Sequence, residues 1–266
     1  GTFDGLPLPL MGANPLKKNI FMEFDWLPTD ASCGSGFSYQ PTAAVINRFE
    51  QSFANAPVSN PDGSTGIDVI SDFGQTPLSF FNKGNLVTDT IAPIGSINGG
   101  VNDAEYAAIK AANFHPSREG YFHYTLMMHR YNTNSGSSGQ AEILGDDLIV
   151  SLQCFNDVNW LSNTIMHELG HNLGLLHGGN TSAVNYKPNY NSVMNYRYQF
   201  PGVDDDCTVS GDGVLDYSRG TRITLNENSL LEANGICGAG SPVDWDADST
   251  IDVAAVAVDI NNVDGL

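Results

Sequence analysis

Residues 167–177 read HELGHNLGLLH, and this stretch determines the interpretation of the rest of the chain. His167 and His171 are four residues apart, so on a helix their imidazole rings share one face and can bind one metal ion. Glu168 would lie beside that ion without being a ligand, where it can accept a proton from an attacking water molecule. The pattern predicts a helical zinc site with a built-in general base.

The second half of the stretch supplies a turn and a third ligand. Gly174 follows the second histidine by three residues, and glycine tolerates the left-handed conformation that ends a helix. The turn would bring His177 to the same ion. Three protein ligands leave the fourth position of zinc for water, which is typical of a catalytic rather than a structural site. The chain has only 6 histidines, and half of them fall in this stretch, which disfavours a chance grouping.

The stretch resembles the extended zinc signature of the metzincin clan of metalloproteases. Ser192–Tyr196 reads SVMNY and is similar to the clan's Met-turn, in which Met194 would form a hydrophobic floor beneath the metal. The resemblance covers Leu161–Tyr196 and implies a zinc-dependent endopeptidase with Glu168 as the catalytic base. Tyr196 is similar to a tyrosine of the astacin and serralysin branches that contacts zinc and stabilises the tetrahedral intermediate. The alternative for this residue is an ordinary buried tyrosine.

The pattern upstream of the stretch predicts a mixed arrangement of strands and helices. Aromatic and apolar runs predict strands at 19–27, 67–73, 121–131 and 147–152. Helical spacing of apolar residues, with proline, asparagine or aspartate at the start, predicts helices at 41–56, 102–113 and 160–173. Beyond Gly174, turn residues and acids dominate.

These elements predict an α+β fold in a single catalytic domain spanning residues 1–266. Residues 1–177 would form an N-terminal subdomain with a mixed twisted sheet, two or three helices and the zinc helix. Residues 178–266 would form an irregular C-terminal subdomain with the Met-turn and acidic loops. The metzincin resemblance implies that the active-site cleft lies between the two.

The charge of the chain limits its partners. With 11 basic and 30 acidic residues the net charge is −19, which repels nucleic acid and anionic lipid. No apolar run approaches the roughly 20 residues that span a bilayer. We therefore expect no nucleic-acid partner and no membrane span. The chain begins with Gly1 rather than Met, which is consistent with processing, and a pro-segment would lie upstream.

The four cysteines lie far apart in the sequence and form no CxxC pair, which disfavours a cysteine zinc site. They are Cys33, Cys154, Cys207 and Cys237. An even number fits two disulfides in an oxidising compartment and predicts a secreted, extracellular protein. Three connectivities are open, and Cys207–Cys237 with Cys33–Cys154 is favoured because the first pair brackets an acidic segment. Four free thiols in a cytosolic protein are the alternative.

A cluster of aspartates near the C-terminus predicts a calcium site. Four of them match positions 1, 3, 5 and 9 of an EF-hand loop, namely Asp244, Asp246, Asp248 and Asp252. Ser249 and Ala255 stand where such a loop has glycine and a bidentate glutamate, which disfavours a true EF-hand. A looser calcium site and a solvated acidic loop both remain open.

The expected substrate is a protein or peptide, bound extended along an edge strand near Gly139–Ile143. Two other functions remain open: a non-catalytic adhesion module that binds zinc and calcium, and a zinc hydrolase that acts on a non-peptide amide. The remaining histidines, His115, His123 and His129, are expected to be structural.

Overall fold

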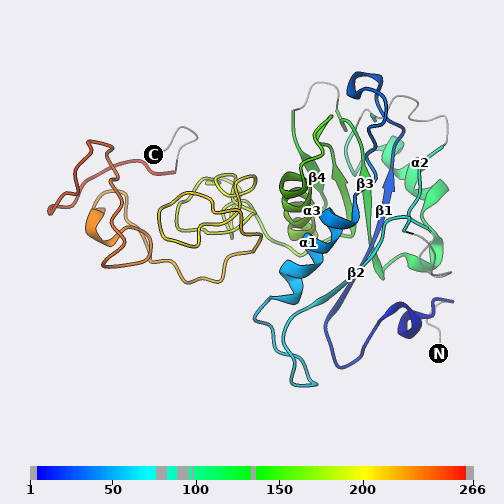
Figure 1. The fold of residues 1–266 in the computed structure, drawn as a ribbon, viewed down its shortest axis with the longest axis horizontal. Coiled ribbons are helices and arrows are strands. Elements are labelled where there is room, and N and C mark those ends of the chain that lie inside the picture. Colours follow the sequence, from blue (N-terminus) through cyan, green and yellow to red (C-terminus); the bar gives the residue numbers. More distant parts are fainter. Residues whose placement is uncertain (1–4, 76–82, 89–95, 98, 133–135, 262–266) are drawn as a thin grey trace. The chain divides into compact units, whose positions relative to one another are not determined.

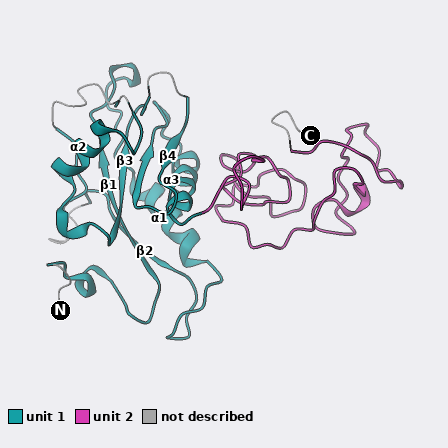
Figure 2. Cartoon of the chain, turned by 180° about the vertical axis from the view of Figure 1, so that it is seen from behind, with its two compact units in different colours: residues 1–174 teal, residues 175–266 magenta. Residues whose placement is uncertain are grey.

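The computed structural model describes residues 5–75, 83–88, 96–97, 99–132 and 136–261 (Figure 1). The chain divides into two compact units, Gly1–Gly174 and Leu175–Leu266 (Figure 2). The division falls at the glycine that follows the HELGH helix, three residues before the subdomain boundary expected from the sequence. Within the described residues, no helix combines the length and apolar character needed to cross a membrane.

The first unit contains a mixed sheet, which in the described residues has five strands. In spatial order these are β2 (Asp68–Asp72), β1 (Asn19–Trp26), β3 (Phe122–Met127), β5 (Asp147–Val150) and β4 (Gly139–Ala141). The pairs β1–β2, β1–β3 and β3–β5 are parallel, whereas β4 runs antiparallel to β5 and forms one edge. The predicted α+β class with a mixed sheet is confirmed.

The strand that carries His123 is shorter than the sequence predicts, since β3 ends at Met127 and not at Tyr131. The chain leaves the sheet there because other segments take over its hydrogen bonds. The carbonyl oxygen of His129 accepts from the amide of Gln153, and that of Arg130 accepts from Ile97. Aromatic content alone therefore overestimated the length of this strand.

Three α-helices surround the sheet in the described residues: α1 (Ala43–Ala54), α2 (Ala104–Asn113) and α3 (Val158–Asn172). Short 3-10 helices are η1 (Leu8–Met11), η2 (Ala31–Cys33), η3 (Pro116–Arg118) and, in the second unit, η4 (Glu232–Asn234). The helix α3 begins two residues earlier than predicted. Its start is determined by Asp157, whose side chain accepts hydrogen bonds from the amides of Asn159 and Trp160 and so caps the helix.

The sheet has helices on both faces. Tyr106 and Ile109 of α2 belong to the same buried cluster as Phe122, Tyr124 and Leu126 of β3. Residues of β3 alternate between faces, so His123, Thr125 and Met127 point to the other side, where α1 and α3 contact β2, β4 and β5. The HELGH helix is therefore positioned by direct packing against the β4–β5 end of the sheet.

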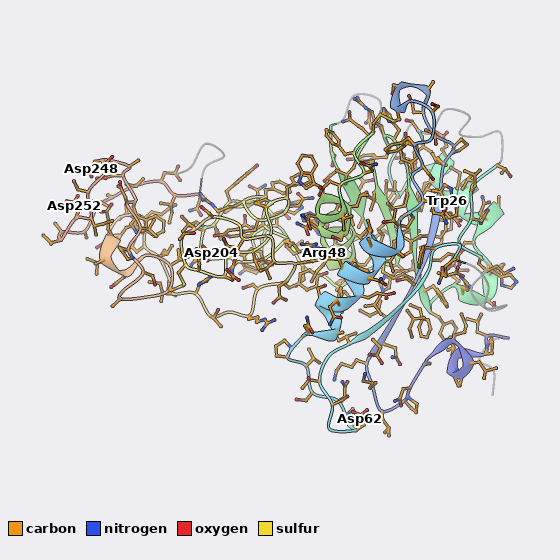
Figure 3. All side chains as sticks on the ribbon, viewed as in Figure 1. Trp26, Arg48, Asp62, Asp204, Asp248 and Asp252 are labelled. Carbon is orange, nitrogen blue, oxygen red and sulfur yellow. A yellow bond between two sulfur atoms is a disulfide. The ribbon has the colours of Figure 1, made fainter. Side chains whose placement is uncertain are left out.

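Arg48 ties α1 to α3 (Figure 3). Its Nη1 donates to Ser162 Oγ at 2.6 Å and to Asn163 Oδ1 at 2.7 Å, and both acceptors are fully buried. These bonds satisfy polar groups in the first half of α3, which would otherwise destabilise a buried helix. The second half of α3, which carries the histidines, is held by different partners described below.

Three carboxyl groups and one guanidinium are buried together on the α2 face of the sheet. Arg118 Nη1 lies 2.5 Å from Glu23 Oε2, and its Nη2 lies 2.7 Å from Asp72 Oδ2. The third carboxyl group, of Asp25, accepts a hydrogen bond from the Tyr124 hydroxyl at 2.8 Å. Burial raises the pKa of Glu23 to about 8, against the opposing effect of Arg118. Because its folded pKa is raised, Glu23 binds a proton on folding.

This linkage makes the stability of the first unit depend on pH. The contribution of Glu23 to the free energy of unfolding is complete below its ordinary pKa of 4.5. It is lost as the pH rises through the folded-state pKa of about 8. Glu23→Gln, which stays neutral, should flatten the fall in the free energy of unfolding between about pH 5 and about pH 9. The difference should be on the order of 1 kcal/mol or more, because one pKa unit corresponds to about 1.4 kcal/mol. Urea unfolding measures it, with the exposed Glu119→Gln as control; parallel curves for wild type and Glu23→Gln would contradict the prediction.

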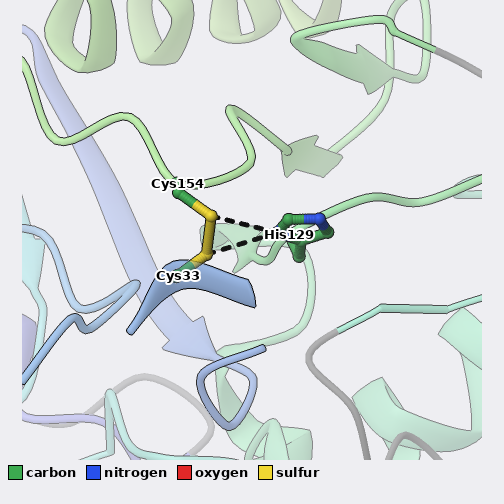
Figure 4. Close-up of side chains that lie close together, drawn as sticks. All are labelled: Cys33, His129 and Cys154. Atoms are coloured by element: carbon green, nitrogen blue, oxygen red, sulfur yellow. Dashed lines mark hydrogen bonds between the residues drawn. A yellow bond between two sulfur atoms is a disulfide. The ribbon is translucent and has the colours of Figure 1, made fainter. Parts of the chain in front are cut away.

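Both disulfides follow the pairing that the sequence favoured. Cys33–Cys154 joins η2 to the segment between β5 and α3, and Cys207–Cys237 lies within the second unit. His129 packs against the first disulfide, with its Nδ1 3.5 Å from Cys33 Sγ and 4.0 Å from Cys154 Sγ (Figure 4). A crosslink just before α3 restricts the start of the helix that carries the histidines.

The second unit is irregular, as expected. Among its described residues the only helix is η4, and isolated bridges such as Val203 with Val214 and Leu230 with Val256 replace strands. A small buried cluster forms its core: Leu230, Ile236, Val243, Trp245 and Ile260. The Cys207–Cys237 disulfide lies against this cluster, which fits a unit whose own apolar core is small.

Candidate metal centre

The C-terminal half of α3 carries two of the predicted ligands and the predicted base. His167, Glu168 and His171 are all buried, with 2 %, 3 % and 8 % of their surface exposed. The imidazole rings of His167 and His171 have centroids 4.9 Å apart and planes at 86°. The spacing of four residues therefore places both rings on one side of the helix, as helical geometry requires.

Gly174 follows the helix in a left-handed conformation, with φ of 90°. Its amide donates to the carbonyl oxygen of His171 at 2.9 Å. A Cβ atom at this position would come within 2.6 Å of the Leu144 side chain. The left-handed conformation thus favours glycine at this turn, whereas the exposed Leu144 side chain could move aside for a larger residue.

One ring nitrogen from each of His167, His171 and His177 lies within 4.8 Å of the other two. This donor set fits zinc, because imidazole nitrogens are preferred zinc ligands and three of them leave a position for water or substrate. The assignment of these three histidines as zinc ligands stays a prediction.

Glu168 lies against the edge of the sheet. A Cβ atom built on Gly139 of β4 would be 2.4 Å from Glu168 Oε1 and 2.5 Å from the carbonyl oxygen of Ile149. Only glycine therefore allows the edge strand to approach the carboxyl group this closely. Burial raises the pKa of the Glu168 carboxyl group well above its usual range. Sequence reasoning placed Gly139 in the edge strand expected to bind substrate but did not identify its contact with Glu168, because one glycine beside a Gly- and Ser-rich loop gives no signal of such a contact.

The segment predicted to be a Met-turn is a tight turn with a buried interior. Met194 is fully buried, and the amide of Asn195 donates to the carbonyl oxygen of Ser192 at 2.9 Å. The side-chain amide of Asn195 donates to the carbonyl oxygens of Lys187 and Tyr190 at 2.5 Å and 2.9 Å. These bonds hold the turn rigidly within the second unit.

Tyr196 stacks on the third predicted ligand. Its ring centroid lies 4.3 Å from that of His177 and 5.7 Å from that of Tyr186. Tyr196 keeps 37 % of its surface exposed and is therefore not the ordinary buried tyrosine of the alternative interpretation. Tyr186 was not identified from the sequence, because its contact depends on how the loop at 185–196 folds.

The C-terminal acidic residues gather around a glutamate that the sequence analysis missed. Carboxylate oxygens of Glu232, Asp244 and Asp246 lie within 4.8 Å of one another. Glu232 is fully buried, and its oxygens accept from the amides of Trp245 and Asp252 at 2.7 Å each. The position of Glu232, 12 residues before Asp244, lies outside any EF-hand spacing.

The two remaining predicted calcium ligands make local contacts. Asp248 Oδ1 accepts from the amide and hydroxyl of Thr250, while Asp252 contributes its amide to Glu232 (Figure 3). Asp248 therefore uses one of its oxygens to form the turn, and Asp252 contributes its backbone to the acidic group. Within the described residues, Glu232, Asp244 and Asp246 form one of several groups of carboxylates that could hold a cation.

The other three histidines have ordinary polar contacts. His115 caps η3 and contacts Ser117, His123 bonds Asn172, and His129 contacts Tyr39 and the first disulfide. His129 and the two cysteines lie close enough to bind a metal, but the disulfide removes both thiolates as ligands. These contacts agree with the structural roles expected for all three.

Comparison with known proteins shows a distant similarity to solved structures. No model of a known protein family matches the chain, and no curated protein matches it. Among solved structures, the chain is similar to the crystal structure of archaemetzincin from Methanopyrus kandleri, with 14 % sequence identity. The match covers 70 % of this chain and 84 % of that chain, with a TM-score of 0.36.

Proposed function

We propose that this chain is a zinc-dependent endopeptidase of the metzincin type. The observation that supports this most directly is the group of three histidine nitrogens within 4.8 Å of one another, with Glu168 directly after the first of them. His167, His171 and His177 would hold the zinc. When bound, zinc would polarise a water molecule and the scissile carbonyl group and stabilise the developing oxyanion.

The protein's own residues would then move the proton and bind the substrate. Glu168 accepts a proton from the attacking water and delivers it to the leaving amine. Its burial beside the edge strand excludes bulk water from this transfer. Tyr196, whose ring lies beside that of His177, would donate a hydrogen bond from its hydroxyl group to the oxyanion.

A peptide substrate would add a strand to the edge of the sheet at β4. Among the described residues this edge strand pairs only with β5, so its outer backbone groups would pair with an extended chain. Gly139 of β4 touches the Glu168 carboxyl group, so a peptide bound there passes beside the base. The net charge of −19 favours neutral or basic peptides over acidic ones.

Gly139→Ala should lower peptidase activity without loss of zinc. The added methyl group has no room between Glu168 and Ile149, so the edge strand or the carboxylate must move. We expect kcat/KM to fall by about 10-fold or more, since displacement of a catalytic group by about 1 Å can cost about 100-fold. Gly136→Ala is the matched control, because a Cβ atom there meets nothing within 4 Å. Equal activity of the two variants would contradict the role of Gly139.

We further propose that the protein is secreted. Two disulfides in one chain of this size are typical of an oxidising compartment and rare in the cytosol. A peptidase that works outside the cell would also need protection from its own activity before export, which an upstream pro-segment would supply.

Digestion of casein with and without a metal chelator tests the main proposal. Activity that disappears with the chelator and returns with zinc supports an endopeptidase. Stoichiometric zinc without any cleavage would instead favour the non-catalytic adhesion module. Zinc-dependent cleavage of small amides, with casein and a diverse peptide library both left intact, would favour a hydrolase of non-peptide amides.

Calcium binding in the second unit stays a prediction. Three carboxylates within 4.8 Å repel one another unless a cation compensates, so added calcium should raise the melting temperature of zinc-loaded protein. Asp246→Ala should reduce this rise and leave the zinc content unchanged, whereas Asp62→Ala in an exposed loop of the first unit should not. Thermal melts with added calcium or a calcium-selective chelator measure the effect. Identical melting curves would show that these acids are only a solvated surface.

A further inference from the structure

The residue after the second predicted ligand, Asn172, makes three side-chain hydrogen bonds to other parts of the first unit. Its Nδ2 lies 2.9 Å from the carbonyl oxygen of Glu142 and 3.0 Å from that of Asp147. Its Oδ1 lies 3.0 Å from His123 Nδ1. Only 5 % of the Asn172 surface is exposed, so none of these bonds is readily replaced by water.

The chemistry of these partners determines which group donates. Carbonyl oxygens only accept, so the NH₂ group of Asn172 must face Glu142 and Asp147. Its oxygen is then left to accept from His123, which must carry its proton on Nδ1. Burial lowers the pKa of His123, which favours the neutral ring with a single N–H. The amide of Asn172 thus uses both donors and its acceptor in one defined orientation.

These bonds join three elements at the end of α3. Glu142 and Asp147 flank the turn between β4 and β5, and the Glu142 amide donates to the carbonyl oxygen of Asp147 at 3.1 Å and so closes the turn. His123 lies on β3. From the same turn, the amide of Leu144 donates to the carbonyl oxygen of His171 at 3.1 Å. The β4–β5 turn therefore bonds the end of α3 in two ways. Its backbone bonds the carbonyl oxygen of His171, and its backbone carbonyl groups also accept from the side chain of Asn172.

We infer that Asn172, oriented by His123, is a positioning residue that holds the His171 end of the helix against the β4–β5 turn. This inference rests on the proposed function, because its consequence is a preorganised zinc site. The turn directly follows β4, the edge strand proposed to bind substrate. The hydrogen bonds of Asn172 to the turn therefore also set the distance between His171 and β4. Groups that orient a ligand from outside the metal's own shell typically contribute about 10- to 100-fold in metal affinity.

Asn172→Ala should weaken zinc binding by about 10-fold, measured by competition with a chromophoric chelator. The activity lost at limiting zinc should return at saturating zinc, because Asn172 acts on the metal site and does not touch the substrate. Exchange of the Leu144 amide hydrogen should become faster, since its acceptor, the His171 carbonyl, is no longer held in place.

Asn163→Ala is the matched control. Asn163 is a buried asparagine on the same helix, and its side chain binds Arg48 rather than the β4–β5 turn. It should lower the melting temperature and leave zinc affinity at the wild-type value. Zinc affinity that is equal in Asn172→Ala, Asn163→Ala and wild type would overturn the inference, whereas a wild-type protein that binds no zinc would overturn the proposed function itself.

Variants of His123 keep the inference testable if Asn172→Ala does not fold. His123→Leu removes the donor and should weaken zinc binding in the same direction. His123→Asn should restore it, because the amide nitrogen of Asn lies as many bonds from the backbone as Nδ1 of His. Equal zinc affinity in both His123 variants and wild type would show that the hydrogen bonds of Asn172 do not position His171.

Discussion

Glu168→Gln should abolish nearly all peptidase activity while the protein keeps its zinc. The glutamine side chain has the same shape but cannot accept the proton of the attacking water, and general-base catalysis typically contributes about 100- to 10,000-fold. We expect kcat/KM to fall by roughly that factor. The melting temperature should not fall, because burial already disfavours a charge at this position, as the raised pKa of Glu168 indicates.

Single-turnover kinetics on a fluorogenic peptide, together with metal analysis of the same sample, measure this effect. Glu119→Gln, the same change at an exposed position, is the control and should behave as wild type. Substantial turnover by zinc-loaded Glu168→Gln would mean that another group accepts the proton. A loss of zinc in this variant would mean that Glu168 helps to hold the metal.

His177→Ala should release zinc under conditions in which the wild-type protein retains it. Two imidazoles on one helix seldom hold a catalytic zinc ion, whereas three protein ligands are the usual set. The dissociation constant for zinc should rise by more than about 100-fold. Loss of a residue that only orients a ligand costs up to about 100-fold in metal affinity, and loss of a ligand should cost more. Activity should fall in proportion to the zinc content.

Metal analysis after dialysis against a weak chelator tests this prediction. His115→Ala removes a histidine that contacts only Ser117 among the interactions described here, and it should retain one zinc per chain. Full zinc occupancy in His177→Ala would show that a different residue supplies the third ligand. Since the ring of His177 also lies against that of Tyr196, Tyr196→Leu, which removes the aromatic ring, should keep its zinc and so separate loss of the metal from loss of the ring contact.

Much of the fold could be predicted because its elements are encoded locally. The strand β1 is a continuous aromatic and apolar run, and α1 repeats its buried residues Val45, Ile46, Phe49 and Phe53 at helical spacing. Element ends were less predictable, since they depend on partners elsewhere. The early end of β3 results from bonds to Ile97 and Gln153, which no local pattern reveals.

By itself, the sequence predicted the metal-binding part of the proposed site. His167 and His171 lie on one helical face, and Gly174 turns the chain three residues before His177, so helix geometry alone predicts that they converge. The sequence also favoured the observed disulfide pairing. These features are local or depend on a few covalent links, so they can be inferred without knowledge of the packing.

Only the tertiary structure decided what surrounds these residues. Gly139 touches Glu168 from 29 positions away, and Asn172 binds Glu142, Asp147 and His123 across three elements. Glu232 enters the acidic group of the second unit in the same way. Such contacts form only when the sheet, the helix and the loops have packed. A buried polar group must then find its partner wherever the fold places one, whatever its position in the sequence.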